Sequence, residues 1–337
     1  MNRTITGVPG IHAGHAQDTD ARTGCTVVIG PFRAAAHVPG QATGTRELHA
    51  IEPTSLVERI DAVLLTGGSA FGLAAAEGVV RWLEERGAGF ETGVARVPVV
   101  PAAVLFDLAA GRADARPDAA MGRAACEAAS TAPLAEGAVG AGTGATVGKV
   151  LGPAGASPGG VGSWCATCGA WSVGAIAAVN AFGDVVDASG VIVAGARDAD
   201  GRFADTMRLL STGAAVPDFP RTHTNTTLAL IATDAPLTRT GLQPLARSAA
   251  AAFAARIRPV FTPFDGDVIF AVSTAEVPET LSPQQQLALA VVARQVLEIA
   301  IVRAVTKHVA PLGPGGGRRG NTDDAVDRSA GSTQIGE

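Results

Sequence analysis

The chain has 337 residues, 47% of them hydrophobic and 17% charged, and this composition excludes a globally disordered protein. Its formal net charge is −5, and it contains neither a basic stripe nor about 18 consecutive apolar residues, which argues against nucleic acid and membranes as partners. Four cysteines predict no disulfide scaffold, and the first residues lack the apolar segment of a signal peptide. We therefore expect a soluble, cytoplasmic protein.

Short apolar segments alternate with helical patterns in the first part of the chain. Residues 25–29 and 60–65 are short and aliphatic, which predicts two buried strands. The sequence Ser-Leu-Val-Glu at residues 55–58 has the spacing of a capping box and predicts a helical turn. The apolar spacing over residues 70–86 and 119–129 predicts two helices.

The second part of the chain begins with loops and ends with regular elements. A glycine-rich loop over residues 137–148 ends at Lys149, and residues 200–225 are polar and irregular. The segments beyond them combine strongly apolar strands with helical patterns. We predict two or three strands over residues 171–194, strands at residues 227–233 and 268–273, and helices at residues 237–257 and 283–304.

Helices and strands are mixed along the chain without a regular strand–helix–strand alternation. This pattern predicts an α+β fold of packed layers rather than a doubly wound sheet. We assign residues 1–310 to a single domain. Residues 311–337 contain Gly, Arg, Asp and Ser with almost no apolar side chains, which predicts a disordered tail.

Several familiar motifs match only in part. The segment 67–71 starts like the nucleophile turn of serine hydrolases, and residues 140–149 resemble phosphate-binding glycine loops, but in both the spacing fails. Cys165 and Cys168 have the spacing of a redox dithiol, yet a strand-like sequence follows where a helix would be needed to lower a thiol pKa. We interpret the loop as flexible and the thiols as small buried side chains, and we predict no metal and no cofactor.

Asn225, Thr226 and Thr227 lie where the irregular polar segment ends and an apolar strand begins. Around this junction the chain resembles the family of self-processing L-aminopeptidase/D-esterases (DmpA-like), which includes β-peptidyl aminopeptidases and the endo-type nylon-oligomer hydrolase. The Asn-Thr-Thr junction and an Asp-Gly-Asp turn are most similar to the nylon-oligomer branch. The matching blocks are residues 65–73, 104–107, 122–124, 148–150, 179–180, 225–234 and 265–267.

The resemblance implies a four-layer α/β/β/α sandwich, similar to N-terminal-nucleophile hydrolases but with different connectivity. It also implies that the chain cuts itself between Asn225 and Thr226, giving an α chain of residues 1–225 and a β chain of residues 226–337. The expected assembly is a homo-oligomer of such αβ heterodimers, and the expected substrate is a small amide or peptide. No metal or organic cofactor is implied.

A threonine hydroxyl is a weak nucleophile unless a base lies beside it. If Thr226 becomes the first residue of a new chain, its own α-amine, with a reference pKa of about 8, can accept the hydroxyl proton. Thr227 is the alternative nucleophile. The family's spacing of six residues from the nucleophile to the Ala of Ala-Thr-Asp fits Thr226 and Ala232, and we therefore prefer Thr226.

Four further residues are candidates for the catalytic site. Burial of Lys149 after its glycine loop would lower its pKa and let it share the role of base; the alternative is an ordinary surface lysine. Asn180 can donate to a developing oxyanion, or it is a turn residue. Asp265 and Asp267 can orient Lys149 and the new amine, or they form a plain Asp-Gly turn before a strand.

Gly67, Gly68 and Ser69 precede the predicted helix, whose amino end can receive an anion or shape the substrate pocket; a tight strand-to-helix turn is the alternative. Phe106 departs from the family, because relatives commonly carry Tyr in this block with its hydroxyl assigned to the oxyanion. The chain contains no tyrosine, and losing one oxyanion donor costs about 100- to 1000-fold in rate. A weakened or non-catalytic relative is therefore one alternative, and an acyltransferase of the ornithine acetyltransferase type, with the same fold and nucleophile, is another.

Overall fold

The computed structural model describes residues 2–213 and 225–307. These residues form a nine-stranded sheet in the order β10-β11-β14-β16-β2-β4-β7-β3, with β1 paired to β2 outside this path. Its strands are β1 (His12–Asp18), β2 (Thr23–His37), β3 (Thr45–Arg46), β4 (Ile60–Thr66), β7 (Ala102–Val104), β10 (Gly160–Cys168), β11 (Trp171–Asn180), β14 (Thr226–Thr233) and β16 (Val268–Ser273).

Helices and shorter strands complete the described part of the chain. The helices are α1 (Ala75–Glu84), α2 (Ala119–Glu127), α3 (Thr206–Ser211), α4 (Arg239–Ala249), α5 (Ala251–Arg256) and α6 (Pro283–Thr306). The shorter strands are β5 (Phe90–Glu91), β6 (Arg96–Val97), β8 (Thr146–Val147), β9 (Ser157–Pro158), β12 (Asp184–Val186), β13 (Ile192–Ala194) and β15 (Ile257–Arg258).

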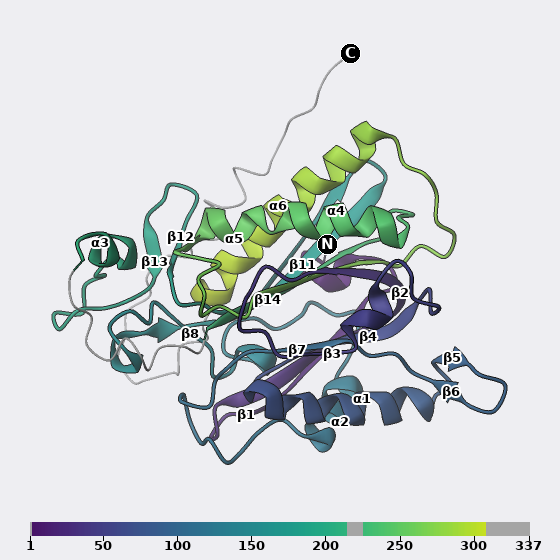
Figure 1. The fold of residues 1–337 in the computed structure, drawn as a ribbon, viewed down its shortest axis with the longest axis horizontal. Coiled ribbons are helices and arrows are strands. Elements are labelled where there is room, and N and C mark those ends of the chain that lie inside the picture. The colour runs from purple at the N-terminus through teal and green to yellow at the C-terminus, as the bar shows by residue number, and fades with distance from the viewer. Residues whose placement is uncertain (1, 214–224, 308–337) are drawn as a thin grey trace.

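The long strand β2 divides the continuous sheet into two facing layers (Figure 1). Its residues 23–32 pair with β1 and β4, whereas residues 33–37 pair with β16. Successive side chains of a strand point to opposite faces, so alternate residues of each layer meet between the layers. Leu228 and Leu230 of β14 pack there in one cluster with Val28 and Leu65 of the other layer.

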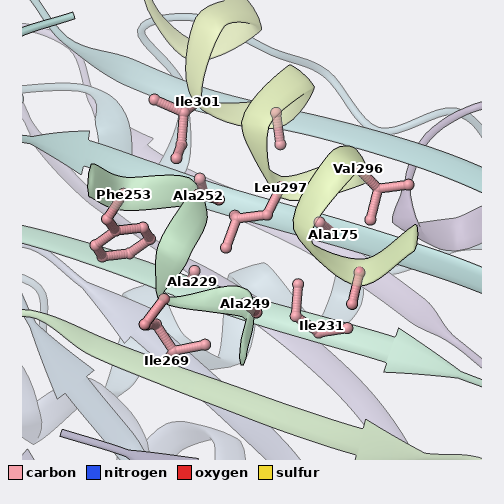
Figure 2. Packing of buried hydrophobic residues seen from close by; sticks show 14 of the residues in the cluster. Ala175, Ala229, Ile231, Ala249, Ala252, Phe253, Ile269, Val296, Leu297 and Ile301 are labelled. Atoms are coloured by element: carbon pink, nitrogen blue, oxygen red, sulfur yellow. The ribbon is translucent and has the colours of Figure 1, made fainter. Parts of the chain in front are cut away.

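Helices cover the outer face of each β layer. On one side α4, α5 and α6 lie over β14 and β16, where Ile231 and Ile269 belong to the same buried cluster as Phe253 and Leu297 (Figure 2). On the other side α1 and α2 pack against each other and over β2 and β4. The predicted four-layer α/β/β/α sandwich is therefore confirmed.

The strand that begins at the Asn-Thr-Thr junction lies inside its layer. β14 is antiparallel to β11 on one side and parallel to β16 on the other. The register places Thr226 opposite Asn180 and Thr227 opposite Val179. The residue before the strand, Asn225, forms a bridge with Asp265. Residues distant in the sequence therefore meet at one end of three neighbouring strands.

The predicted helical turn at residues 55–58 is wrong. These residues form no helix, and a 3₁₀ helix lies at Leu48–Ile51 instead. The buried guanidinium of Arg239 donates hydrogen bonds to the carbonyl oxygens of Glu52, Ser55 and Val57. The backbone of this segment is therefore held by a side chain from a distant helix, which a local sequence pattern does not reveal.

Other predicted elements differ from the observed ones in where they begin and end. The helix predicted at 237–257 is divided into α4 and α5, and the one predicted at 70–86 begins as a 3₁₀ helix over Ser69–Ala74. The polar segment 200–225 contains α3. The sequence pattern does not predict β1 and β10, in which Gly, His and Ser interrupt the apolar alternation. The tail predicted at 311–337 lies outside the described residues.

Within the described ranges, no helix combines the length and the apolar character that crossing a bilayer requires.

Leu297 tests the packing of α6 on the sheet. Its side chain is fully buried, whereas Leu287 on the same helix is 67% exposed. We expect Leu297→Ala to lower the free energy of unfolding by about 2–5 kcal/mol, because it leaves a cavity in a closed cluster. Leu287→Ala should change it by less than about 0.5 kcal/mol. Chemical denaturation of both variants measures the difference, and equal effects would contradict the described packing.

Candidate active site

The candidate site is built where β14 begins, between β11 and the turn before β16. Thr226 is the first residue of β14 and is only 4% exposed. Asn180 ends β11 directly opposite Thr226, and Asp265 forms a bridge with Asn225. The sequence-predicted residues Asn225, Thr226, Asn180 and Asp265 are thus brought together by strand pairing alone.

Two hydrogen-bond donors meet at the carbonyl oxygen of Asn225. The hydroxyl of Thr226 donates to it at 2.5 Å, and the backbone N–H of Gly266 donates to it at 2.9 Å. Donors on a carbonyl oxygen draw electron density from the carbon and stabilise negative charge that develops on the oxygen. The peptide bond between Asn225 and Thr226 therefore lies in a polarising environment beside a hydroxyl group.

Gly266 can approach this carbonyl because it has no side chain. A Cβ atom at this position would lie 2.7 Å from the Thr226 hydroxyl oxygen and 2.6 Å from the carbonyl oxygen of Ala42. Both distances are shorter than van der Waals contact, and one of the two neighbours is backbone. A larger residue would therefore displace the donor, the hydroxyl, or both.

Lys149 is buried next to this group, with 7% of its surface exposed. Its ammonium donates to the backbone carbonyl of Asn180 at 3.0 Å and to the Asn180 side-chain oxygen at 2.9 Å. Burial lowers the pKa of Lys149 to about 7, although the carboxylates of Asp265 and Asp107 pull it upward. An amine with this pKa is neutral in a large fraction of molecules at physiological pH and can accept a proton.

Asp265 and Asp267 are both buried, and each holds a backbone N–H. Asp265 accepts from the N–H of Thr262 at 2.7 Å, and Asp267 accepts from the N–H of Thr227 at 2.6 Å. Burial raises the pKa of both carboxyl groups, and for Asp267 the neighbouring Asp265 raises it further. The pair fixes the backbone on either side of Gly266, and the Asp265 carboxylate stabilises the Lys149 ammonium.

Asn180 and Phe106 are joined through the Asn180 amide. The side-chain nitrogen of Asn180 donates to the Phe106 carbonyl at 2.9 Å, while its side-chain oxygen also accepts from the N–H of Thr146 at 3.0 Å. Phe106 is partly exposed, and its side chain lines a cavity. In the continuous chain Asn180 thus links Lys149 to the cavity wall.

The turn of Gly67, Gly68 and Ser69 lies against a carboxylate of the protein itself, the side chain of Asp107. The N–H of Gly68 donates to the Asp107 carboxylate at 2.7 Å, and the Thr23 hydroxyl donates to the same carboxylate at 2.7 Å. A Cβ on Gly67 would lie 2.1 Å from this carboxylate, so the close approach requires glycine. Ser69 is among the residues that line the cavity and Gly67 and Gly68 are not; Gly68 holds the Asp107 carboxylate, against which Gly67 packs.

A cavity of about 180 Å³ opens beside the junction of Asn225 and Thr226. None of the described residues that line it has an ionisable side chain. They are aliphatic, aromatic, hydroxyl-bearing or amide-bearing residues and a glycine: Ala42, Thr43, Gly44, Ser69, Ala70, Val104, Phe106, Asn225, Thr226 and Phe264. A larger cavity of about 520 Å³ lies elsewhere, near Gly30, Arg59 and Phe90, and includes none of the predicted site residues.

Sequence reasoning missed two residues of this site. In the sequence, Gly266 is only the centre of an Asp-Gly-Asp turn. Its hydrogen bond to Asn225 forms because two distant segments pair, and no local pattern predicts that pairing. Asp107 belongs to a matching block, but no role is predicted for it. Its position three residues after the end of the buried strand β7 is the signal that could have indicated a functional carboxylate. Its pKa is raised by burial, and it lies close enough to Lys149 to affect the lysine.

The cysteines show no sign of an activated thiol. Cys165 and Cys168 lie on β10, and burial raises the pKa of Cys165 to about 11 and that of Cys168 as well. A raised pKa keeps a thiol protonated and unreactive. In residues 2–213 and 225–307, no group of three His, Cys, Asp or Glu side chains is arranged to hold a metal ion.

Comparison with known sequences gives a match over most of the chain. The pattern of Peptidase family S58 matches residues 3–316. An uncharacterized aminopeptidase of Mycobacterium tuberculosis is 42% identical over 316 residues, which cover 86% of this chain and 88% of the relative. A 6-aminohexanoate-oligomer endohydrolase of Kocuria sp. is 30% identical over 279 residues, which cover 82% of this chain and 76% of that enzyme.

Solved structures share the fold. The L-aminopeptidase D-Ala-esterase/amidase of Ochrobactrum anthropi, described as a variant of the Ntn hydrolase fold, has a TM-score of 0.70 at 20% identity. The match covers 91% of this chain and 86% of that one. A β-aminopeptidase of Burkholderia sp. has a TM-score of 0.69 at 22% identity, with 91% and 87% covered.

The pKa of Lys149 can be measured directly, because the chain contains only one other lysine, Lys307. We expect Lys149 to titrate near pH 7, and Asp265→Asn to lower its pKa further, because the carboxylate stabilises the ammonium. NMR titration of protein labelled with ¹³C at the lysine ε-carbon reports both values, and Lys149→Arg identifies the signal. A pKa near 10, or a rise in Asp265→Asn, would contradict the described environment.

Proposed function

The chain belongs to peptidase family S58 and is a hydrolase of peptide or amide bonds, and on this basis we propose that it cleaves its own Asn225–Thr226 bond and then uses Thr226 as nucleophile. The proposed substrates are small peptide-like amides or polyamide oligomers. The observation that carries the proposal is the double hydrogen bond to the Asn225 carbonyl, from the Thr226 hydroxyl and the Gly266 N–H.

The geometry favours Thr226 over Thr227 as the nucleophile. Thr226 lines the cavity, and its hydroxyl lies against the carbonyl of the bond to be cut. Side chains alternate along β14, so Thr227 lies on the same face as Ala229 and Ile231, which pack under the helices. Its hydroxyl is buried and has no hydrogen-bond partner among the described residues. No substrate carbonyl can reach it there.

In the proposed self-cleavage, the Thr226 oxygen attacks the Asn225 carbonyl carbon while a base takes the hydroxyl proton. The Gly266 N–H stabilises the oxyanion that forms. The C–N bond then breaks, the Thr226 nitrogen takes a proton, and Asn225 is held as an ester on the Thr226 oxygen. Water hydrolyses the ester, which leaves a carboxylate on Asn225 and a free α-amine on Thr226. Until that amine exists, the proposed base is Lys149, which is bonded to Asn180, the residue paired with Thr226.

Hydrolysis of a substrate would repeat these steps with a free nucleophile. The Thr226 α-amine or Lys149 accepts the hydroxyl proton, and the oxygen attacks the substrate carbonyl. The leaving amine departs with a proton, and water then releases the acid from the Thr226 ester. Asp265 and Asp267 hold the backbone around Gly266, and Asp265 stabilises the charged form of Lys149.

The Gly266 N–H can take over the role that the family assigns to a tyrosine hydroxyl, which this chain lacks. A backbone donor at this place can stabilise an oxyanion without any hydroxyl at Phe106. This supports an active enzyme over a non-catalytic relative. In the proposal, residues 1–310 form one catalytic domain, and cleavage divides the whole chain into an α chain of 1–225 and a β chain of 226–337. A cytoplasmic location is proposed from the composition of the sequence, and an oligomer of αβ heterodimers is proposed on family resemblance alone.

Replacing the nucleophile should abolish processing. We expect wild-type protein to give two fragments and Thr226→Ala to remain one chain of 33.7 kDa, because the attacking oxygen is lost. Thr227→Ala is the matched control and should still be cut. Intact-mass spectrometry distinguishes the species. Cleavage of Thr226→Ala at this bond, or loss of cleavage only in Thr227→Ala, would refute the assignment.

Self-cleavage should depend on the protonation of Lys149. Only the neutral amine accepts a proton, so the rate should rise with pH, with a midpoint of about 7, and level off above it. Lys149→Arg, which stays charged, should slow cleavage by about 100- to 10,000-fold. Refolded precursor sampled over time at each pH gives the rates. A pH-independent rate, or normal cleavage in Lys149→Arg, would exclude this role.

A further inference from the structure

We infer that Arg116, outside the cavity, forms a subsite for a free carboxylate on the part of the substrate that leaves as an amine. Peptides that end in a carboxylate are then preferred over the same peptides ending in a carboxamide. The inference rests on the proposed function and adds a specificity-determining residue to it. It makes no claim about the charge of the acyl group.

The rim of the cavity begins with a strained turn. Ser69 has a φ of 54°, in the left-handed region that residues other than glycine rarely adopt, and its N–H donates to the Leu105 carbonyl at 2.9 Å. Strained backbone of this kind is typical of functional sites. Ser69 and Ala70 both line the cavity, and Ala70 is exposed. Ala70 therefore lies where the cavity meets the solvent.

Phe71 follows on this rim and carries a positive charge on its ring. The Phe71 side chain is 57% exposed, and the guanidinium carbon of Arg116 lies 3.7 Å from the ring centroid. Stacking on an aromatic face orients a guanidinium plane and leaves the N–H groups at its edge able to bind an anion. Because consecutive Cα atoms are about 3.8 Å apart, the guanidinium lies within about 11 Å of the Ala70 Cα.

Arg116 is anchored to the same turn from the other side. Its Nε donates to the Ala113 carbonyl at 2.8 Å. The next residue, Pro117, is buried against Gly68, where an added Cβ would lie 2.8 Å from the proline Cδ. Among the residues that the structure describes, none forms an ion pair with Arg116. The guanidinium is therefore held in position while its terminal N–H groups can still bind a carboxylate.

The acidic residues beside Arg116 in the sequence have other partners. Asp114 lies near Arg116, but its two carboxylate oxygens accept from Arg112 at 3.2 and 2.8 Å. Asp118 accepts from the N–H of Met121 at the start of α2. A carboxylate that arrives with a substrate can therefore pair with Arg116 through two parallel N–H···O bonds, the strongest geometry for such a pair.

The cavity is too small to hold a whole peptide. Its volume of about 180 Å³ equals that of about six water molecules. The remainder of a substrate must pass over the rim at Ala70, and about three extended residues span the distance from there to the guanidinium. The carboxylate of a peptide belongs to the amine that leaves, so Arg116 recognises that part of the substrate.

Peptides and their carboxamides measure the preference. The substrates have alanyl or 6-aminohexanoyl as acyl group and one, two or three glycines as the leaving amine, each as free acid and as carboxamide. With processed wild-type protein we expect kcat/KM to be about 5- to 50-fold higher for the acid at one or more of these lengths, mainly through KM. Equal values, or higher values for the carboxamides, at all three lengths would overturn the inference.

Arg116→Gln removes the charge and keeps most of the side-chain stem. We expect it to lower the acid-to-carboxamide ratio of kcat/KM by at least about 5-fold. Arg86→Gln is the matched control, because Arg86 also stacks at 3.7 Å on a ring, that of Trp82, and neither residue lines the cavity. Both substrates are measured on the same variant, so a general loss of structure cancels in the ratio. An unchanged ratio in Arg116→Gln, or an equal fall in Arg86→Gln, would refute the subsite.

Thr226→Ala separates this inference from the proposed function. Turnover that disappears in Thr226→Ala while wild-type protein shows no preference for the acids would refute the inference and leave the nucleophile assignment standing. Turnover that persists in Thr226→Ala would refute the nucleophile assignment. No turnover of any of these peptides by fully processed protein would contradict both.

Discussion

The site depends on one backbone contact, the hydrogen bond from the Gly266 N–H to the Asn225 carbonyl. This contact exists because β14 and β16 run parallel and the turn before β16 lies level with the start of β14. It brings the Thr226 hydroxyl, a polarised carbonyl and two buried carboxyl groups into one place. Any change in the register of these strands would move the donor away from the carbonyl, because neighbouring residues of a strand face opposite sides.

The surrounding fold keeps this contact out of water. The inter-sheet cluster closes one side of β14, and α4, α5 and α6 close the other. Burial then determines the electrostatics, because it lowers the pKa of Lys149 toward neutrality and raises those of Asp265 and Asp267. The same packing that stabilises the sandwich therefore also lowers the pKa of a lysine that is bonded to Asn180, the residue paired with Thr226.

Much of the fold and several residues of the candidate site could be predicted from the sequence. The abrupt change from polar to apolar residues at Asn225 marks the start of β14, and an isolated lysine after a glycine loop marks Lys149. The contacts of Gly266 and Asp107 could not be predicted, because only the folded sheet brings these residues to Asn225, Gly67 and Gly68; for Asp107 the sequence offers no more than a position after a buried strand. The prediction of a helical turn at 55–58 was wrong for the same reason, because Arg239 from a distant helix holds the backbone of this segment.

In the proposed maturation, one specific peptide bond is cut so that a buried hydroxyl residue becomes the first residue of a new chain. Amino-terminal sequencing of the smaller fragment from purified protein identifies the bond that is cut. We expect the sequence Thr-Thr-Leu-Ala, beginning at Thr226. A terminus that begins Thr-Leu-Ala-Leu, or a preparation with no new terminus in this region, would contradict it.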